Sequence, residues 1–284
     1  MMPKPDFRTI AAGTRLYNFH SHTQYCDGRA TVAEFAAAAA LARFEHYGFS
    51  PHSPIPIASG CNMSEADVES YMSDIEDIRG KYAGRVEFYA GMEIDYLGPM
   101  WGPSHSYFQH LGLDYSIGSV HFIPDREGTL IDIDGNFERF CSNMKDYFHR
   151  DIRYVVETYF RHSLAMIEAG GFDILGHFDK VSQNASLWQP GIENEAWYER
   201  WIDLMFEAIK SSGVIVEINT KSNQVHGRLF PAMRHIPRLV ESGAVILVNS
   251  DAHDPRLINA SREYAFGVID GLRMNLNSRS DSEA

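Results

Sequence analysis

Short apolar runs alternate with longer amphipathic stretches along most of the chain. The runs are often β-branched, and each has the length of a buried strand; they lie at Leu16–Phe19, Phe44–Phe49, Val86–Gly91, Tyr115–Val120, Phe172–Leu175, Val214–Ile218 and Ala244–Asn249. Most are separated by segments with helical periodicity, which is the pattern of parallel βαβ units. Wholly apolar strands suit a sheet that is covered on both faces. The pattern therefore predicts an α/β fold, either a barrel or a doubly wound open sheet.

Helix boundary signals lie between these runs. Thr31 and Glu34 form a capping-box pattern, and Ser64 with Asp67 forms a weaker one. Helices are also predicted at 151–169, 194–211 and 231–241. No linker rich in Pro, Gly or Ser divides the sequence, and 284 residues suffice for one barrel. We therefore expect a single domain over residues 1–284, with a core over about 16–270 and a frayed polar tail at 277–284.

The composition limits the partners that the protein can have. A formal net charge of −13 argues against a nucleic-acid surface, which needs clustered Lys and Arg. It does not argue against an anionic substrate, because bound divalent cations reverse the local field.

The longest apolar run, near 36–41, is too short to span a membrane, and the N-terminus has no apolar core of a signal peptide. Cys26, Cys61 and Cys141 form no CxxC pair, so we expect free thiols and a cytoplasmic protein. The oligomeric state is not indicated.

Polar residues with metal-binding side chains follow the strands, near the point where each strand ends. Taken in strand order, they are His20, His22 and Asp27; His52; Glu93 and Asp95; His121; His177 and Asp179; Asn219 and Thr220; and Asp251 and His253. Parallel strands place their carboxyl ends on one face, where α/β barrels hold their active sites. Side chains that are scattered in the sequence are therefore expected to converge there.

The residue types at this face indicate metal binding. Imidazole and carboxylate ligands together suit Zn, Fe and Mn. His20 and His22 point the same way in an extended segment, and Asp251 and His253 repeat that spacing. The six histidines and at least three carboxylates exceed the needs of one ion. We expect two or three divalent ions, bridged by Glu93 and a hydroxide.

A structural role is the alternative for each histidine taken alone, since a single histidine at a strand end is usually a hydrogen-bonded packing residue. Seven histidines outside the pattern are assigned to that class: His46, His105, His110, His149, His162, His226 and His235. The other six histidines all fall just past the ends of predicted strands, which chance does not readily produce. It is the joint pattern that indicates a metal cluster.

The ligand positions and their flanking phrases resemble the polymerase-and-histidinol-phosphatase (PHP) family. The phrases Ser-Pro-His-Ser-Pro, Tyr-Ser-Ile-Gly-Ser-Val-His, Gly-His-Phe-Asp and Glu-Ile-Asn-Thr are similar to its histidinol-phosphate phosphatase branch. The resemblance implies a distorted (β/α)7 barrel of the TIM-like PHP type. It also implies a phosphomonoesterase that hydrolyses L-histidinol phosphate to L-histidinol and phosphate in histidine biosynthesis.

The resemblance further implies three sets of metal ligands. The first set is His20, His22, Glu93 and Asp251; the second is Glu93, His121 and His177; the third is Asp27, His52 and His253. Within these sets, the catalytic role falls to Glu93, Asp251 and His253. Candidates for contacts with the substrate are Lys180, Lys221, Asn219 and His226.

The sequence departs from that branch after Gly-His-Phe-Asp, where some members carry an Arg that suits phosphate. Here the stretch begins with Lys180 and contains no Arg. Lys180 or Lys221 can replace its charge but not its bidentate geometry. The loop 55–63 is also specific to this chain.

For the proton donor to the leaving group, His226, Asp95 and Asp179 are open alternatives, and the two aspartates can equally orient ligand histidines.

Three other functions compete with this interpretation. A phosphodiesterase or nucleotide-directed enzyme can use the same cluster, although the acidic charge counts against it. An amidohydrolase barrel also uses His-x-His, but it usually needs a Lys after the fourth strand, where this chain has His121. A binding module without activity would be expected to lack ligands, and the matched ligand positions are all filled.

Overall fold

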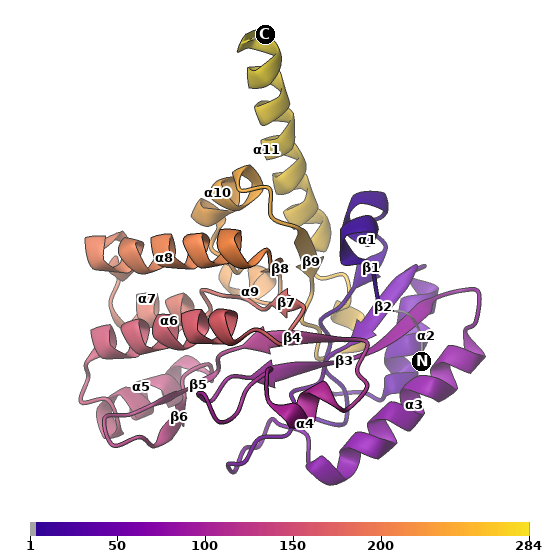
Figure 1. Cartoon of the computed structure of the whole chain (residues 1–284), viewed down its shortest axis with the longest axis horizontal. Helices are drawn as coiled ribbons and strands as arrows, with labels where there is room; N and C mark the ends of the chain where they lie inside the picture. The colour runs from indigo at the N-terminus through magenta and orange to yellow at the C-terminus, as the bar shows by residue number, and fades with distance from the viewer. Residues whose placement is uncertain (1–3, 284) are drawn as a thin grey trace.

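Seven parallel strands form the centre of the computed structural model, which describes residues 4–283 (Figure 1). The strands neighbour one another in the order β1 (Tyr17–Asn18), β2 (His46–Phe49), β3 (Glu87–Asp95), β4 (Tyr115–Ser119), β7 (Ile174–Leu175), β8 (Ile215–Asn219) and β9 (Ile246–Asn249). Every paired neighbour is parallel. A parallel bridge between Ser21 and Ala252 brings the last strand back to the first. The sheet is thus a nearly closed barrel, which confirms the predicted fold and rules out the open sheet.

Helices cover the outside of the barrel (Figure 1). They are α1 (Phe7–Gly13), α2 (Val32–Leu41), α3 (Val68–Lys81), α4 (Ser106–Gln109), α5 (Phe137–Asp146), α6 (Ile152–Ala169), α7 (Val181–Trp188), α8 (Ala196–Ser212), α9 (Asn223–His226), α10 (Ile236–Glu241) and α11 (Arg262–Glu283). The capping box predicted at Thr31 and Glu34 begins α2. Asp151 caps α6 by accepting from the Tyr154 N–H. The long helices α6 and α8 lie side by side.

Side chains complete the closure of the barrel, because β1 has only two residues. Asn249 Oδ1 accepts from the Phe19 N–H at 2.9 Å. In the opposite direction, Asn18 Oδ1 accepts from the Ser250 N–H at 2.8 Å. These two buried amides stand in for ladder hydrogen bonds between the first and last strands. They also fix the two chain segments that carry the His-x-His and Asp-x-His pairs.

Aromatic rings pack around Tyr115, the first residue of β4. This group, which also contains Phe7, Phe19 and Tyr89, is called the aromatic floor. The Tyr115 hydroxyl donates to the carbonyl oxygens of Phe19 and Phe49, at 2.7 and 3.0 Å. A Cβ added at Gly48 or Gly91 would lie 2.3–2.4 Å from atoms of the Tyr115 side chain. Glycine is therefore required at both strand positions by the close approach of this ring.

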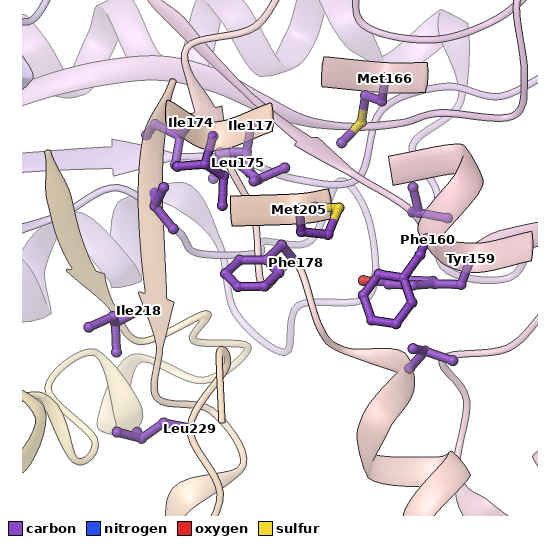
Figure 2. Close-up of a cluster of buried hydrophobic side chains, with 14 of the residues drawn as sticks. Ile117, Tyr159, Phe160, Met166, Ile174, Leu175, Phe178, Met205, Ile218 and Leu229 are labelled. Atoms are coloured by element: carbon purple, nitrogen blue, oxygen red, sulfur yellow. The ribbon is translucent and has the colours of Figure 1, made fainter. Parts of the chain in front are cut away.

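The apolar core continues between the barrel and the helices (Figure 2). Ile117, Ile174 and Leu175 point from β4 and β7 toward Phe178 and Met205. All five side chains are buried, so this contact holds α8 against the strands that carry ligand candidates.

Several elements differ from the sequence-based predictions. The fifth strand is confined to Ile174–Leu175, whereas the third continues through Asp95, so Glu93 lies within a strand. A hairpin of β5 (Phe122–Pro124) and β6 (Leu130–Asp132) was not predicted. The final helix continues to Glu283, over the segment expected to be a frayed tail.

Two further expectations concern the whole chain. The three cysteines are free thiols in the described residues, as expected. Among the helices of residues 4–283, none combines the length and the apolar character that a membrane crossing requires.

Candidate metal centre

All nine residues predicted as metal ligands converge at the carboxyl end of the strands. Their donor atoms form four overlapping groups, within each of which the atoms lie no more than 4.8 Å apart. The groups are His20, His22 and Asp251; His20, Glu93 and His177; His52, Glu93 and His121; and His22, Asp27, His52 and His253. The ends of six strands from distant parts of the sequence thus build one continuous cluster. The metal-binding roles of these residues stay a prediction.

Glu93 lies at the centre of this cluster. Its Oε2 is 3.1–3.4 Å from ring nitrogens of three histidines, namely His20, His22 and His52. Its Oε1 is 2.8 Å from His177 Nε2 and 3.5 Å from His121 Nε2. Ser119 Oγ donates to the same oxygen at 2.7 Å and fixes the carboxylate. A carboxylate with histidines facing both oxygens has the geometry of a ligand that bridges two ions.

The carboxylates of Asp27 and Asp251 define the other side of the cluster. Asp251 Oδ1 lies 3.1 Å from His22 Nε2, and Asp27 Oδ1 lies 3.2 Å from His253 Nε2. The predicted third set therefore occurs together, with His22 added to it. The predicted second set is divided, because His177 groups with His20 and His121 with His52. The grouping of donor atoms by distance thus differs from the ligand sets that the sequence resemblance implies.

Unpaired atoms in the cluster fit a cation. His20 Nε2, His22 Nε2, His52 Nδ1 and Asp27 Oδ1 are buried and have no hydrogen-bond partner among the described residues. Burying such atoms without a partner costs about 1–3 kcal/mol each. Most of these atoms face neighbouring ligand candidates, and a divalent cation would satisfy several at once. The mixture of imidazole and carboxylate suits Zn, Mn and Fe.

Two carboxylates outside the ligand groups hold the histidine rings in place. His20 Nδ1 lies 2.7 Å from Glu217 Oε1, and His121 Nδ1 lies 2.7 Å from Asp95 Oδ1. Such contacts set the tautomer and the orientation of a metal-binding imidazole. Asp95 therefore occupies the orienting position, one of the two roles weighed for it. Glu217 was not predicted from the sequence, although a charged residue inside the apolar strand β8 could have indicated a functional role.

Carboxylates make the electrostatic field negative around some histidines of the cluster. Burial disfavours charge on His20, but nearby carboxylates raise its pKa well above the ordinary value. The same competition raises the pKa of His121 to about 10, because Asp95 and Glu93 outweigh burial. Burial also opposes the ionised form of Glu93, yet the surrounding histidines hold its pKa well below the ordinary value. The site thus attracts positive charge, whether as protons or as metal ions.

The backbone at Asp251 is strained. Its φ angle is +49°, in the left-handed region that non-glycine residues rarely adopt. Asn219 Nδ2 donates to Asp251 Oδ2 at 3.1 Å and so supports the side chain. Strained residues of this kind concentrate at functional sites, where the surroundings over-determine the conformation. Asn219 therefore contacts a ligand candidate in this structure.

The four candidates for substrate contacts lie in different surroundings. Lys221 Nζ is 3.3 Å from Asp251 Oδ1 and 3.2 Å from His253 Nε2, so its ammonium borders the cluster. Lys180 instead forms an ion pair with Asp134 at 2.8 Å, and its side chain is 10% exposed. His226 is exposed at the end of α9. The structure thus brings Lys221 and Asn219 to the cluster and gives Lys180 a carboxylate partner of its own.

Asp179, an alternative proton donor, lies in a different environment from the ligand groups. It is fully buried, and its Oδ2 accepts from the Ala232 N–H at 2.8 Å. Burial raises its pKa to about 7, and Arg228 only partly offsets that rise. Its contacts are structural ones with the segment after β8.

A cavity of about 140 Å³ lies beside the cluster. Asp27, His52 and His121 form its metal-site wall, and Lys221 also lines it. Cys61 and Asn62 from the loop after β2 also line the cavity, as do Phe122 and Asp132 of the β5–β6 hairpin and Asp134 just after it. The cavity therefore offers a charged, partly enclosed space next to the ligand candidates.

Comparisons with known proteins agree with this arrangement. The PHP domain family matches residues 18–221, which include seven of the nine ligand candidates. A protein of Deinococcus radiodurans named probable histidinol-phosphatase is 24% identical over 249 residues, covering 85% of this chain and 88% of that protein. The histidinol-phosphatase of Bacillus subtilis is 26% identical over 218 residues, or 71% of this chain and 79% of that protein.

A solved structure shares the fold. The histidinol phosphate phosphatase of Lactococcus lactis, complexed with zinc, L-histidinol and phosphate, matches 91% of this chain and 94% of its own with a TM-score of 0.65. The sequence identity is 16%, so this match shows the fold alone. Asp251 and His253 lie beyond the family match, but the tertiary structure returns them to its centre. The barrel, the ligand cluster and the match over more than half of the sequence show that the chain belongs to the PHP domain family.

Proposed function

We propose that this protein is a metal-dependent phosphomonoesterase that hydrolyses L-histidinol phosphate to L-histidinol and phosphate. The coarser assignment, a phosphoesterase of the PHP family, follows from the family match and the cluster of potential ligands. The observation that carries the proposal is Glu93, whose two oxygens face five histidines beside a cavity.

The nine ligand candidates would hold two or three ions, with Glu93 shared between neighbours. When bound, such ions lower the pKa of a coordinated water and offset the charge of a phosphate group. Glu217 and Asp95 orient His20 and His121, so that these rings stay aligned without substrate. Ser119 does the same for Glu93. The scaffold is thus preorganised, which lowers the cost of binding.

Lys221 is the residue best placed to meet the phosphate. It lines the cavity, borders Asp251, and has a side chain that is 38% exposed. Lys180 is less available, because Asp134 neutralises it. We propose Lys221 as the cation that takes the place of the arginine absent after Gly-His-Phe-Asp. A flexible ammonium provides a point charge for a phosphate oxygen.

The choice of histidinol phosphate rests on the relatives and on the charge of the cavity. Relatives that align with most of this chain carry the name histidinol-phosphatase. Asp132 lines the cavity, and its carboxylate suits the amine or imidazole of such a leaving group. The formal charge of −13 supports a small metabolite over a nucleic acid as the substrate.

A panel of phosphate esters tests this proposal. Purified protein, loaded in turn with Zn, Mn or Fe, is assayed for phosphate release from histidinol phosphate, simple phosphomonoesters and a phosphate bis-ester. We expect the highest kcat/KM for histidinol phosphate and loss of activity after treatment with a chelator. A preference for the bis-ester would replace the proposal by a phosphodiesterase. Preference for another monoester would retain the reaction class but change the substrate.

Two variants test the role of the cluster. Asp251→Asn and His20→Ala should each abolish turnover while leaving the circular dichroism spectrum of the fold largely unchanged. Arg153→Ala, at an exposed position on α6 that contacts Glu157 and the Trp197 ring, is the matched control and should retain activity. Near-normal phosphomonoester hydrolysis by both cluster variants would refute the assignment.

A further inference from the structure

The loop after β2 closes back on the metal cluster through one side chain. The loop runs from His52 to Met63, and the Met63 N–H donates to the His52 carbonyl at 3.0 Å. Immediately before Met63, Asn62 Nδ2 donates to the Ser53 carbonyl at 2.8 Å and to Asp95 Oδ2 at 3.0 Å. The base of the loop is therefore fastened to the backbone beside one ligand candidate and to the carboxylate that orients another.

The amide of Asn62 has a defined orientation. Ser53 O and Asp95 Oδ2 only accept hydrogen bonds, so the atom that faces both is the amide nitrogen, and Ser59 Oγ donates to the remaining Oδ1 at 2.6 Å. Ser59 Oγ in turn accepts from the Cys61 N–H at 3.1 Å. The amide nitrogen then has two acceptors, Ser53 O and Asp95 Oδ2, for its two hydrogens. A side chain with this set of partners acts as a fixed brace.

Asp95 links this brace to the cluster. It is fully buried, its Oδ2 accepts from Asn62, and its Oδ1 lies 2.7 Å from His121 Nδ1. His121 Nε2, the atom on the other side of the ring, lies 3.5 Å from Glu93 Oε1. Removing the Asn62 donor would leave a buried carboxylate oxygen with one partner fewer and free Asp95 to rotate. The His121 ring would then lose its fixed direction.

Both consequences fall on the same ligand group. Asn62 acts on His121 through Asp95, and it holds Ser53, which adjoins His52. His52, Glu93 and His121 form one of the four groups of donor atoms. Asn62 also lines the cavity together with Cys61, so the same loop faces the space for the substrate.

We infer that Asn62 is a positioning residue that sets the metal affinity of the His52–Glu93–His121 group and couples it to the loop 52–63. The inference rests on the proposed function only in requiring that this group binds a metal ion. Orienting contacts of this kind typically change metal affinity by about 10–100-fold. By reciprocity, the bound ion should stabilise the loop by the same factor that the loop stabilises the ion.

Metal titration of the purified protein without substrate tests the inference. In Asn62→Ala we expect one class of site to bind Zn or Co about 10–100-fold more weakly, with the remaining sites unchanged. Asn62→Asp keeps the size of the side chain and the acceptor for Ser59 but turns a carboxylate toward Asp95, so it should weaken that site at least as much. Ser64→Ala is the control, since Ser64 Oγ donates only to Asp67 at the start of the next helical segment.

Two readouts separate positioning from general destabilisation. The visible spectrum of the Co-loaded protein should change in Asn62→Ala but not in Ser64→Ala, because it reports the ligand geometry. In a double-mutant cycle, Asn62→Ala should have a smaller effect on metal affinity once Asp95 is replaced by Ala, because only its contact with Ser53 then remains. Additive effects, or wild-type metal affinity and spectrum in both Asn62 variants, would overturn the inference and leave the phosphoesterase proposal intact. A wild-type protein that binds no metal would overturn both.

Discussion

The two ends of one barrel treat buried polar groups in opposite ways. At the floor, the Tyr115 hydroxyl donates to two backbone carbonyls, and the ring packs edge-on against Phe19. At the other end, His20, His22 and His52 each leave a buried ring nitrogen without a partner among the described residues. The Tyr115 hydroxyl at the floor is hydrogen-bonded within the protein, whereas the cluster has buried atoms that can bind a ligand. The difference separates the part of the barrel that maintains the fold from the part that performs chemistry.

The pKa values of histidines inside and outside the cluster provide a second comparison. The pKa of His121 in the cluster is raised to about 10, since carboxylates outweigh burial. The pKa of His235, which lies away from the cluster at the start of α10, is lowered to about 4 because burial is not offset by such carboxylates. In His22 and His52 of the cluster burial prevails and lowers the pKa, so it is the neighbouring carboxylates of His20 and His121 that set these two rings apart from His235.

The largest effect on activity is expected for Glu93→Gln. The substitution keeps the shape of the side chain but removes the charge that faces five histidines. We expect kcat/KM for the phosphomonoester to fall by at least about 10³-fold, comparable to the loss of a key electrostatic group in other active sites. Phosphate release and metal content measure the effect. A variant with normal metal content and more than a tenth of the wild-type activity would contradict the central role of Glu93.

A substitution at the aromatic floor should instead lower the free energy of unfolding. In Gly91→Ala, the new Cβ would meet the Tyr115 ring at 2.4 Å, and overpacking of this kind costs about 1–3 kcal/mol in the free energy of unfolding. Gly80→Ala is the matched control, because Gly80 lies in α3 with nothing within 4 Å of the added Cβ. Helix propensity predicts that the control is slightly stabilised, by up to about 1 kcal/mol. Equal denaturation midpoints for the two variants would show that the floor is not tightly packed.

The two lysines provide a smaller and more specific test. Lys221→Met should raise the KM for the phosphomonoester by about 10-fold, as expected for loss of about 1.4 kcal/mol of binding. Lys180→Met removes an equal charge but one that already has Asp134 as its partner, and should change KM less. Steady-state kinetics at saturating metal measure both. The reverse order would assign the phosphate contact to Lys180.

The smallest expected effect is on the pH dependence of stability at His235. Its pKa in the folded chain is about 4, compared with an ordinary value of 6.5. Between these values the unfolded chain binds a proton that the folded chain does not, so stability falls as the pH drops from about 6.5 to about 4. His235→Gln should flatten that fall. Chemical denaturation of both proteins at pH 7 and pH 5 measures the difference, and identical differences would contradict the prediction.

The positions of the ligand candidates could be predicted from the sequence because two regular features coincide. Strands that are buried on both faces are short and apolar, so their ends are visible in the sequence. Parallel pairing then requires that these ends meet, and it does so for His20, His52, His121 and Asp251 although they are far apart in the chain. Asp27 was placed from loop spacing alone, and it lies 3.2 Å from His253.

The supporting contacts were less visible. Glu217 is a single charge in an apolar strand, and its partner His20 is 197 residues away. Asn62 lies in a loop without periodicity, and its contact with Asp95 depends on how that loop folds back. Lys180 and Lys221 follow strand ends in similar ways, and only Asp134, from the unpredicted segment after β6, distinguishes them.

By itself, the sequence pattern determined an α/β fold with parallel strands, the face on which its chemistry gathers and the residue types of that chemistry. These follow from periodicity and strand direction, which are local properties of the chain. The pattern left a barrel and an open sheet as alternatives, and only the family resemblance implied the barrel. The tertiary structure decided which atoms share a cation site, which carboxylates orient the rings and which lysine remains open to a ligand. These depend on distances of a few ångströms between segments that are remote in sequence, and such distances are set only when the core packs.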